Sequence, residues 1–97
     1  MYVTILQGQV AQENWGELQR QYEIACKATP EGLLQTFLVQ DDEQKTHWQI
    51  ITFWKNEEAY HKAHEEKKTE TCVLLFCNAG TVPERRHFHV RRGHQRV

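Results

Sequence analysis

The fold is decided by residues 33–60, which read LLQTFLVQDDEQKTHWQIITFWKNEEAY. Two runs rich in β-branched and aromatic residues, 33–40 and 46–55, flank the polar turn DDEQ, and this is the pattern of a β-hairpin. Asn56 follows at the position of a helix N-cap, and the two glutamates after it suit the positive end of a helix dipole. The stretch therefore predicts a strand, a turn, a second strand and the start of a helix.

The chain before the hairpin predicts one strand and one helix. Residues 2–8 alternate, and because both alternating sets are largely apolar or β-branched, we expect a strand covered on both faces. Apolar residues then recur every three or four positions from Trp15 to Cys26, which indicates a helix packed on the core. Asn14 is expected to cap its start. Residues 28–32 contain the proline and glycine expected to end it.

The chain after the hairpin predicts a second helical piece and a last strand. The helical piece runs from Thr69 or Glu70 to Gly80, with Thr69 as its cap and Gly80 as its stop. Residues 83–93 alternate Phe88 and other apolar residues with histidines, which indicates a strand with one apolar and one polar face.

The order of these elements is strand, helix, strand, strand, helix pair, strand. This split βαβ pattern predicts an α+β, ferredoxin-like domain, with a four-stranded antiparallel sheet and helices on one face. We expect a single domain over residues 1–97. Because residues 46–55 carry large apolar groups on both faces, the helix-free face needs a cover. A second copy of the chain is the simplest one, so a homodimer is expected.

Composition and charge restrict the class of protein. With 39% hydrophobic residues, 26% charged residues and a net charge of −1, the chain has the composition of a globular domain and not of a disordered one. Cys26, Cys72 and Cys77 form no CxxC motif, which favours a reducing compartment without a disulfide framework or a zinc ribbon. The first ten residues alternate as a strand and lack the features of a signal peptide. No apolar run reaches the ~20 residues of a membrane span. We therefore expect a soluble, cytoplasmic protein with no membrane partner.

The C-terminal end is locally basic, since residues 84–97 hold five arginines and one glutamate. Such a segment can attract nucleic acid. RNA recognition by a ferredoxin-like sheet, however, requires exposed aromatic residues in a Gly-Phe-like motif on the central strands. Neither YVTILQG nor ERRHFHVRR carries that motif, so no nucleic-acid partner is expected.

Residues 29–60, with the hairpin at their centre, resemble the antibiotic biosynthesis monooxygenase family. Its members show a glycine that opens the second strand, a polar hairpin turn, and a tryptophan followed by a small polar residue and an acidic, alanine and aromatic run. Here these features are Gly32, DDEQ, Trp54, Asn56 and the run EEAY that ends at Tyr60. The resemblance implies a dimeric α+β barrel, in which each subunit encloses a mostly apolar pocket between sheet and helices.

The resemblance also implies a chemistry. Family members of known activity oxidise aromatic polyketides or quinols with dioxygen and no bound cofactor, degrade haem, or handle small signalling metabolites. A cofactor-free oxygenase has to deprotonate its substrate, hold the aromatic rings and exclude water. We therefore expect a pocket that binds a small aromatic or quinol-like substrate, with no cofactor and no metal.

Candidate site residues follow from this chemistry. A histidine can act as base and an arginine can stabilise a phenolate or enolate, and Arg85 or Arg86 leads into the last strand. His64 follows Tyr60 by four residues, so it shares the face of Tyr60 and should lie nearer the pocket than His61. The predicted catalytic residues are His64, Tyr60, Asn56 and Arg86, and the predicted substrate-binding residues are Trp48, Trp54 and Phe76.

Three other functions stay open at this point. A non-catalytic, dimeric small-ligand-binding or regulatory protein would use the same pocket. The haem-degrading branch of the family is less favoured, because this chain has Gln7, Ala63 and Val73 where that branch carries its asparagine, tryptophan and histidine. A metal site would require that histidines of a helix and of a strand converge. The candidates are His61 and His64 on the helix and His87 and His89 on the strand.

Overall fold

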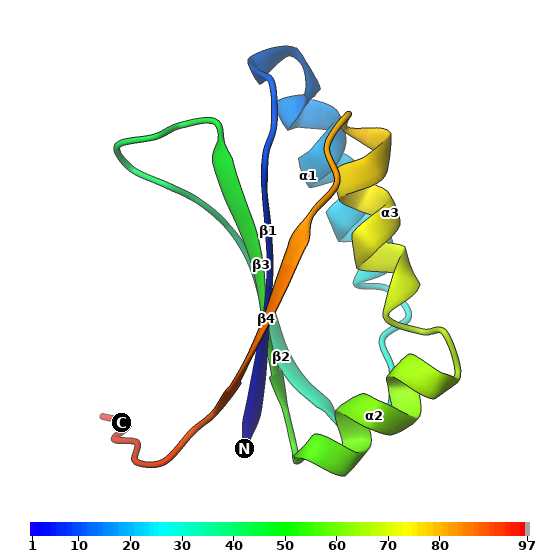
Figure 1. Ribbon diagram of the computed structural model, residues 1–97, viewed down its shortest axis with the longest axis vertical. Coiled ribbons are helices and arrows are strands. Elements are labelled where there is room, and N and C mark those ends of the chain that lie inside the picture. The colour runs from blue at the N-terminus through cyan, green and yellow to red at the C-terminus, as the bar shows by residue number, and fades with distance from the viewer. Residues whose placement is uncertain (97) are drawn as a thin grey trace.

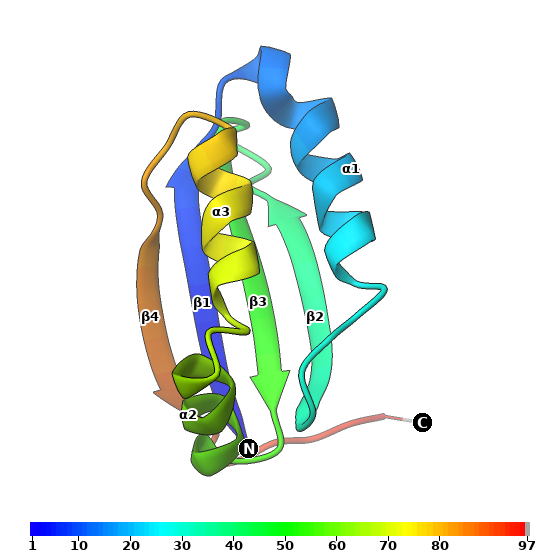
Figure 2. The same cartoon turned by 90° about the vertical axis from the view of Figure 1, so that its right-hand side faces the viewer.

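The computed structural model describes residues 1–96 and confirms the expected α+β, ferredoxin-like architecture. One antiparallel sheet has the strand order β2-β3-β1-β4, and the helices all lie on one face of it (Figure 1, Figure 2). Val97, the last residue of the expected domain, lies outside the described residues. The elements are β1 Tyr2–Gln9, a 3-10 turn η1 Gln12–Asn14, α1 Trp15–Ala25, β2 Leu33–Gln40, β3 His47–Trp54, α2 Glu57–Glu65, α3 Glu70–Asn78 and β4 Glu84–His89.

The helix-covered face of the sheet carries two separate groups of buried residues. Around Ile50 of β3, the larger group joins Leu18 of α1 and Phe76 of α3. The smaller group lies at the other end of the sheet, where Trp54 of β3 packs with Tyr60 of α2 and with Tyr2. Because α1 and α3 cover one end and α2 covers the other, the core is divided along the length of β3.

The start of α2 is held by a cap and by a close backbone contact. Asn56 is the predicted N-cap, and its side-chain oxygen accepts from the backbone N–H of Ala59 at 2.8 Å. Gly32, just before β2, lies against the same turn with φ +87°, and its carbonyl accepts from Lys55 N–H at 2.8 Å. A Cβ on Gly32 would stand 2.6 Å from the Cβ of Ala59. The glycine thus lets the chain pass directly over α2.

Two other predicted caps stand at the N-cap positions of α1 and α3, but neither side chain makes a capping hydrogen bond. Asn14 makes no cap bond, because its side chain donates instead to the backbone carbonyl of Ala79 at 3.2 Å. Thr69 also makes no cap bond, and its hydroxyl lies 3.0 Å from Nδ1 of His64. In each case a partner outside the helix takes the side chain: Ala79, 65 positions along the chain, for Asn14, and His64 at the end of α2 for Thr69. The predicted stop at Gly80 is confirmed by its φ of +89°.

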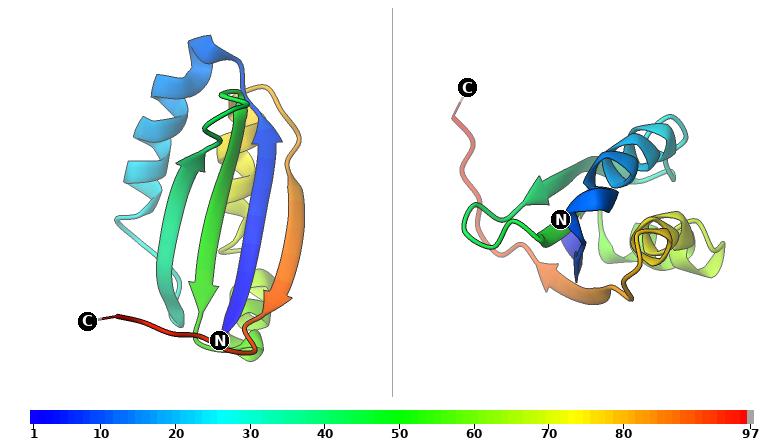
Figure 3. Two further views of the ribbon diagram at one scale, coloured as in Figure 1. Left: turned by 90° about the vertical axis from the view of Figure 1, so that its left-hand side faces the viewer. Right: turned by 90° about the horizontal axis from the view of Figure 1, so that it is seen from above.

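The opposite face of the sheet carries no helix (Figure 3). Its large apolar side chains are half exposed, with 48% of Phe37, 40% of Phe88 and 36% of Val39 accessible. Phe37 packs edge to face on Phe53 of the neighbouring strand, with ring centroids 6.2 Å apart. None of the helices formed by residues 1–96 has the length and apolar character needed to cross a membrane.

We predict that Gly32→Ala lowers the free energy of unfolding by about 2 kcal/mol or more, since it combines a left-handed backbone with a steric overlap. Gly16→Ala is the matched control, because Gly16 lies in α1 and a Cβ there meets nothing within 4 Å. It should raise the free energy of unfolding by about 0.5–1 kcal/mol. Urea unfolding of the three proteins measures both changes. Equal effects of the two alanines would contradict the close packing of Gly32 on α2.

Candidate functional site

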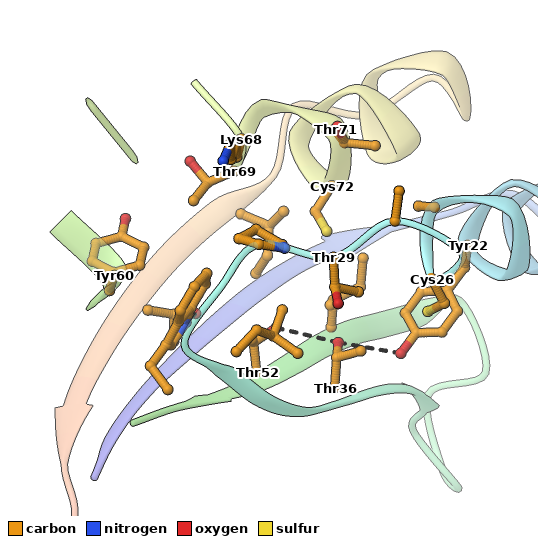
Figure 4. A pocket seen from close by; sticks show the side chains of 18 of the residues that line it. Tyr22, Cys26, Thr29, Thr36, Thr52, Tyr60, Lys68, Thr69, Thr71 and Cys72 are labelled. Atoms are coloured by element: carbon orange, nitrogen blue, oxygen red, sulfur yellow. Dashed lines mark hydrogen bonds between the residues drawn. The ribbon is translucent and has the colours of Figure 1, made fainter. Parts of the chain in front are cut away.

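A pocket opens on the helix-covered face where the two buried groups meet. It holds about 680 Å³ of empty space, the part open to solvent included. Its walls come from the sheet, the end of α1 with the loop after it, the α2–α3 connection and the start of α3 (Figure 4). The aromatic and aliphatic wall is formed by Leu6, Leu33, Ile50, Trp54 and Tyr60.

One end of the pocket carries a fixed positive charge. Arg85 of β4 is half-buried, and its guanidinium donates to the hydroxyl oxygen of Tyr60 at 2.6 Å. Tyr60 is only 3% exposed. Because Arg85 uses the oxygen of Tyr60 as acceptor, the hydroxyl proton of Tyr60 is left for a ligand. The pair can therefore offer one charge and one neutral donor to an oxygen atom of a bound molecule.

His64 lies at the rim of this end. Its ring stacks on Tyr60 with centroids 5.7 Å apart, and Nδ1 is 3.0 Å from the hydroxyl of Thr69 and 3.5 Å from the guanidinium of Arg85. Since an arginine can only donate, Nδ1 is the acceptor nitrogen and the ring proton belongs on Nε2. Thr69 lines the pocket and is buried, so it connects the acceptor nitrogen of His64 with the interior.

The floor of the pocket is a row of hydroxyl groups. Tyr22 of α1 donates to Thr36 of β2 at 3.2 Å, and Thr36 lies 3.2 Å from the hydroxyl of Thr52 of β3 (Figure 4). On the next strand, Thr4 accepts from the indole N–H of Trp54 at 3.1 Å. The floor is thus polar, although most of the same sheet face is apolar.

Two groups of the pocket wall stay protonated at neutral pH. Burial raises the pKa of Tyr22 to about 12. Burial also raises the pKa of the Cys72 thiol, and the nearby Arg85 opposes this shift only in part. Neither group is a base near pH 7. Among residues 1–96, no histidine or carboxylate lines the pocket, and the imidazole of His64 lies at the rim, 3.0 Å from Thr69.

Three other histidines, His61, His87 and His89, surround Tyr2 beside the pocket. Nδ1 of His87 is 2.8 Å from the hydroxyl of Tyr2, and burial, with Arg85 adding to it, lowers the pKa of His87. His61 and His89 both approach the carboxylate of Glu57, at 2.9 and 3.4 Å. Within residues 1–96, no group of three potential ligands is placed to hold a metal ion. These side chains form an aromatic and ionic cluster between β4 and α2.

The predicted site residues separate into those at the pocket and those elsewhere. Tyr60 and Trp54 line it, and His64 contacts two residues that line it. Trp48 and Phe76 belong to the larger buried group and do not reach the pocket. Asn56 serves as the cap of α2.

The arginine selected from the sequence lies on the wrong side of the sheet for the pocket. The guanidinium of Arg86 stands 5.3 Å from the ring centroid of Phe88, on the helix-free face. Its neighbour Arg85 is the one that enters the pocket. Alternation shows that consecutive arginines point to opposite faces, but not which face the helices cover.

The polar floor and the thiol of Cys72 are not evident in the sequence. Tyr22 falls within the apolar stripe from Trp15 to Cys26, and the threonines lie in runs where β-branched residues are expected for any strand. The one available pattern was the presence of a threonine on each of three predicted strands. Its significance depends on the register of the strands, which the sequence does not show.

Comparison with known proteins places the chain in a family. The family model for antibiotic biosynthesis monooxygenases matches residues 1–72. No curated protein sequence matches the chain. A candidate antibiotic biosynthesis monooxygenase from Deinococcus radiodurans has a similar structure, with a TM-score of 0.78 and 15% identity over 100% of this chain and 99% of that one.

Two further solved structures share the fold. SnoaB, a cofactor-independent oxygenase from Streptomyces nogalater, has a TM-score of 0.69 and 13% identity, with 95% of this chain and 94% of that chain covered. A mutant of MhuD with two manganese protoporphyrin IX molecules per active site has a TM-score of 0.76 and 17% identity, with 98% and 99% covered. At these identities the structures show a common fold only. The match over residues 1–72 shows that the chain belongs to the antibiotic biosynthesis monooxygenase family.

Proposed function

We propose that the chain is a cofactor-independent monooxygenase that oxidises a small aromatic or quinol-type molecule in the pocket between sheet and helices. The observation that carries this proposal is the hydrogen bond of Arg85 to Tyr60 at the end of an otherwise largely apolar cavity. A cationic guanidinium beside an aromatic wall stabilises a phenolate or enolate more strongly than it does the neutral molecule. The membership of the family supports the reaction class.

The residues of this chain would act on the proton and on the charge. The substrate hydroxyl gives its proton to the hydroxyl of Thr69, which passes its own proton to Nδ1 of His64. Arg85 and Tyr60 hold the resulting anion. That anion reduces dioxygen by one electron, and the two radicals recombine at a ring carbon that carries a hydrogen to form a peroxide anion. The proton held by His64 returns through Thr69 and converts this anion into a hydroperoxide. Loss of water from the hydroperoxide leaves a new carbonyl group on the ring, so one oxygen atom enters the product and the other leaves as water.

A second function is favoured by a specific observation. Since no imidazole or carboxylate of residues 1–96 lies on the pocket wall, a protein that binds an aromatic anion without turnover would need no change of this structure. In that case the chain would be a dimeric ligand-binding or regulatory protein. Binding of the aromatic molecule without uptake of oxygen would select this function.

We predict that Arg85→Met lowers the turnover of an anthrone-like or hydroquinone substrate by roughly 10²-fold, the size of effect expected when a preorganised charge is removed. Arg86→Met is the matched comparison, because this guanidinium lies over Phe88 on the other face of the sheet. It should leave turnover unchanged. Oxygen uptake and product formation measure both variants. If only Arg86→Met lost activity, the stabilising charge would belong to Arg86, and its assignment to Arg85 would be wrong.

We predict that His64→Ala and Thr69→Val each lower the same turnover by ~10²-fold or more, as expected for a lost general base or its relay. His61→Ala is the control, because His61 is paired with Glu57 and its side chain is 53% exposed. It should change turnover little. Equal losses in both histidine variants, together with stoichiometric zinc or iron in the purified protein, would instead make the histidines a metal site.

The proposal includes a homodimer formed through the helix-free face. This face combines the half-exposed Phe37, Val39 and Phe88 with Ile51 and Phe53 of the central hairpin. A continuous apolar surface of this kind is rarely left in water by a monomer. Family membership supports a second copy of the chain as its cover.

We predict that Phe37→Asp shifts the protein from dimer to monomer, because a carboxylate would be buried in the interface without a partner. Leu74→Asp is the control: Leu74 is similarly exposed, at 55%, but lies on α3, away from this face. It should leave the dimer intact. Sedimentation or light scattering at micromolar concentration gives the answer. A wild-type protein that is monomeric in the same measurement would remove the dimeric barrel.

A further inference from the structure

Three threonines lie side by side across the sheet at the floor of the pocket. Thr4 of β1 is paired with Thr52 of β3, and Thr52 is paired with Thr36 of β2. All three line the pocket. On the same face the neighbours one step further along these strands are Leu6, Ile50 and Leu38. The threonines therefore form a narrow polar band, here called the threonine row, between apolar positions.

Two donor hydrogens at the threonine row take part in none of the hydrogen bonds formed within residues 1–96. The hydroxyls of Tyr22 and of the three threonines, with the indole of Trp54, supply five donor hydrogens, and three hydrogen bonds use three of them. One unused proton belongs to the pair Thr36 and Thr52, and the other belongs to Thr4. Within residues 1–96 neither proton has an acceptor.

Burial makes these two protons significant. Thr52 is 6% exposed and Thr4 is 8% exposed, so bulk water reaches neither side chain freely. Buried donors are rarely left without an acceptor in folded proteins. Because both hydroxyls line the pocket, each can donate its proton to a molecule that enters it.

We propose that the threonine row determines specificity by binding an uncharged acceptor oxygen of the substrate, such as a ring carbonyl. This inference rests on the proposed function, because it takes the phenolate of the same molecule to lie at Arg85. The positions agree with this arrangement. Arg85 is on β4, on one side of β1, whereas the threonine row extends from β1 to β2 over about 9.5 Å, two strand spacings. The substrate class is then a phenol that carries a second, non-ionised oxygen on the far side of its ring.

A floor of hydrogen-bond donors should distinguish between ligands that have and that lack an acceptor oxygen. A site built to donate hydrogen bonds rejects an analogue without the acceptor more strongly than an apolar site rejects a change of shape. Two probes of nearly equal size, 4-hydroxyacetophenone and 4-ethylphenol, share the phenol and differ in the ketone oxygen. The wild-type protein should bind the ketone more tightly. This difference in affinity should depend on the hydroxyl groups of the threonine row.

The experiment is an NMR titration of the two probes against wild type, Thr52→Val, Thr4→Val and Thr46→Val. Thr52→Val and Thr4→Val keep the shape of the side chain, and each should weaken binding of 4-hydroxyacetophenone by about five- to tenfold. Binding of 4-ethylphenol should be unchanged. Thr46→Val is the control, because its hydroxyl donates to Gln9 outside the pocket, and it should alter neither affinity. Urea unfolding of each variant separates a folding defect from a change in affinity.

The outcomes are distinguishable. If Thr52→Val and Thr4→Val change both affinities by the same factor, or change stability alone, the row is a set of structural cross-strand pairs and the inference is overturned. If both probes bind with the expected preference but no phenolic substrate consumes oxygen, only the monooxygenase proposal fails. If Arg85→Met abolishes turnover while the preference for the ketone survives in every threonine variant, only the threonine row fails. A wild-type protein that binds neither probe overturns both.

Discussion

Strand β3 is apolar on both faces, and the other layers of the structure depend on covering it. Trp48, Ile50, Thr52 and Trp54 are buried under the helices, while His47, Gln49, Ile51 and Phe53 alternate with them on the other side. The helices cover only one of these faces. Burying apolar area is the dominant favourable term in folding. The strand at the centre of the core therefore also leaves an apolar surface exposed on the helix-free face.

The pocket arises because the helix layer is not continuous. α1 and α3 cover one end of β3 and α2 covers the other, with Gly32 allowing the chain to pass close over α2. Between the two groups the sheet presents threonines, which are too short to fill the space. A close-packed interior tolerates few voids, so an opening at this point of the core is a feature of the arrangement and marks the region where a ligand fits.

Charge is distributed unevenly along the pocket. Arg85 places a positive charge at one end, where its guanidinium donates to Tyr60 and lies 3.5 Å from Nδ1 of His64. Tyr22 and Cys72, on the helix side of the pocket, are half-buried and remain neutral, because burial raises the pKa of both groups. A molecule with one ionised and one neutral oxygen matches this polarity, whereas a fully apolar molecule leaves buried donors unpaired.

Local patterns were sufficient for the elements and their order. The alternation of residues 46–55, the cap at Asn56 and the stop at Gly80 agree with the structure, because each depends on neighbours within a few residues. Asn14 and Thr69 hold the predicted N-cap positions, but other partners take their side chains: Ala79 far along the chain for Asn14, and His64 of the preceding helix for Thr69. The aromatic residues expected at the pocket divide, because Tyr60 and Trp54 line it while Trp48 and Phe76 pack in the larger buried group.

Other features were decided only by the tertiary structure. Whether Arg85 or Arg86 faces the helices depends on which side of β4 the helices cover. The alternation of side chains along the strand does not indicate that side. The threonine row exists only because three strands meet in one register. The sequence by itself thus determined the helices, the strands and the ferredoxin-like order, because these follow from local backbone preferences and periodicity. The polar floor and the charged end of the pocket come from contacts between residues 16 to 50 positions apart, which only the packed chain brings together.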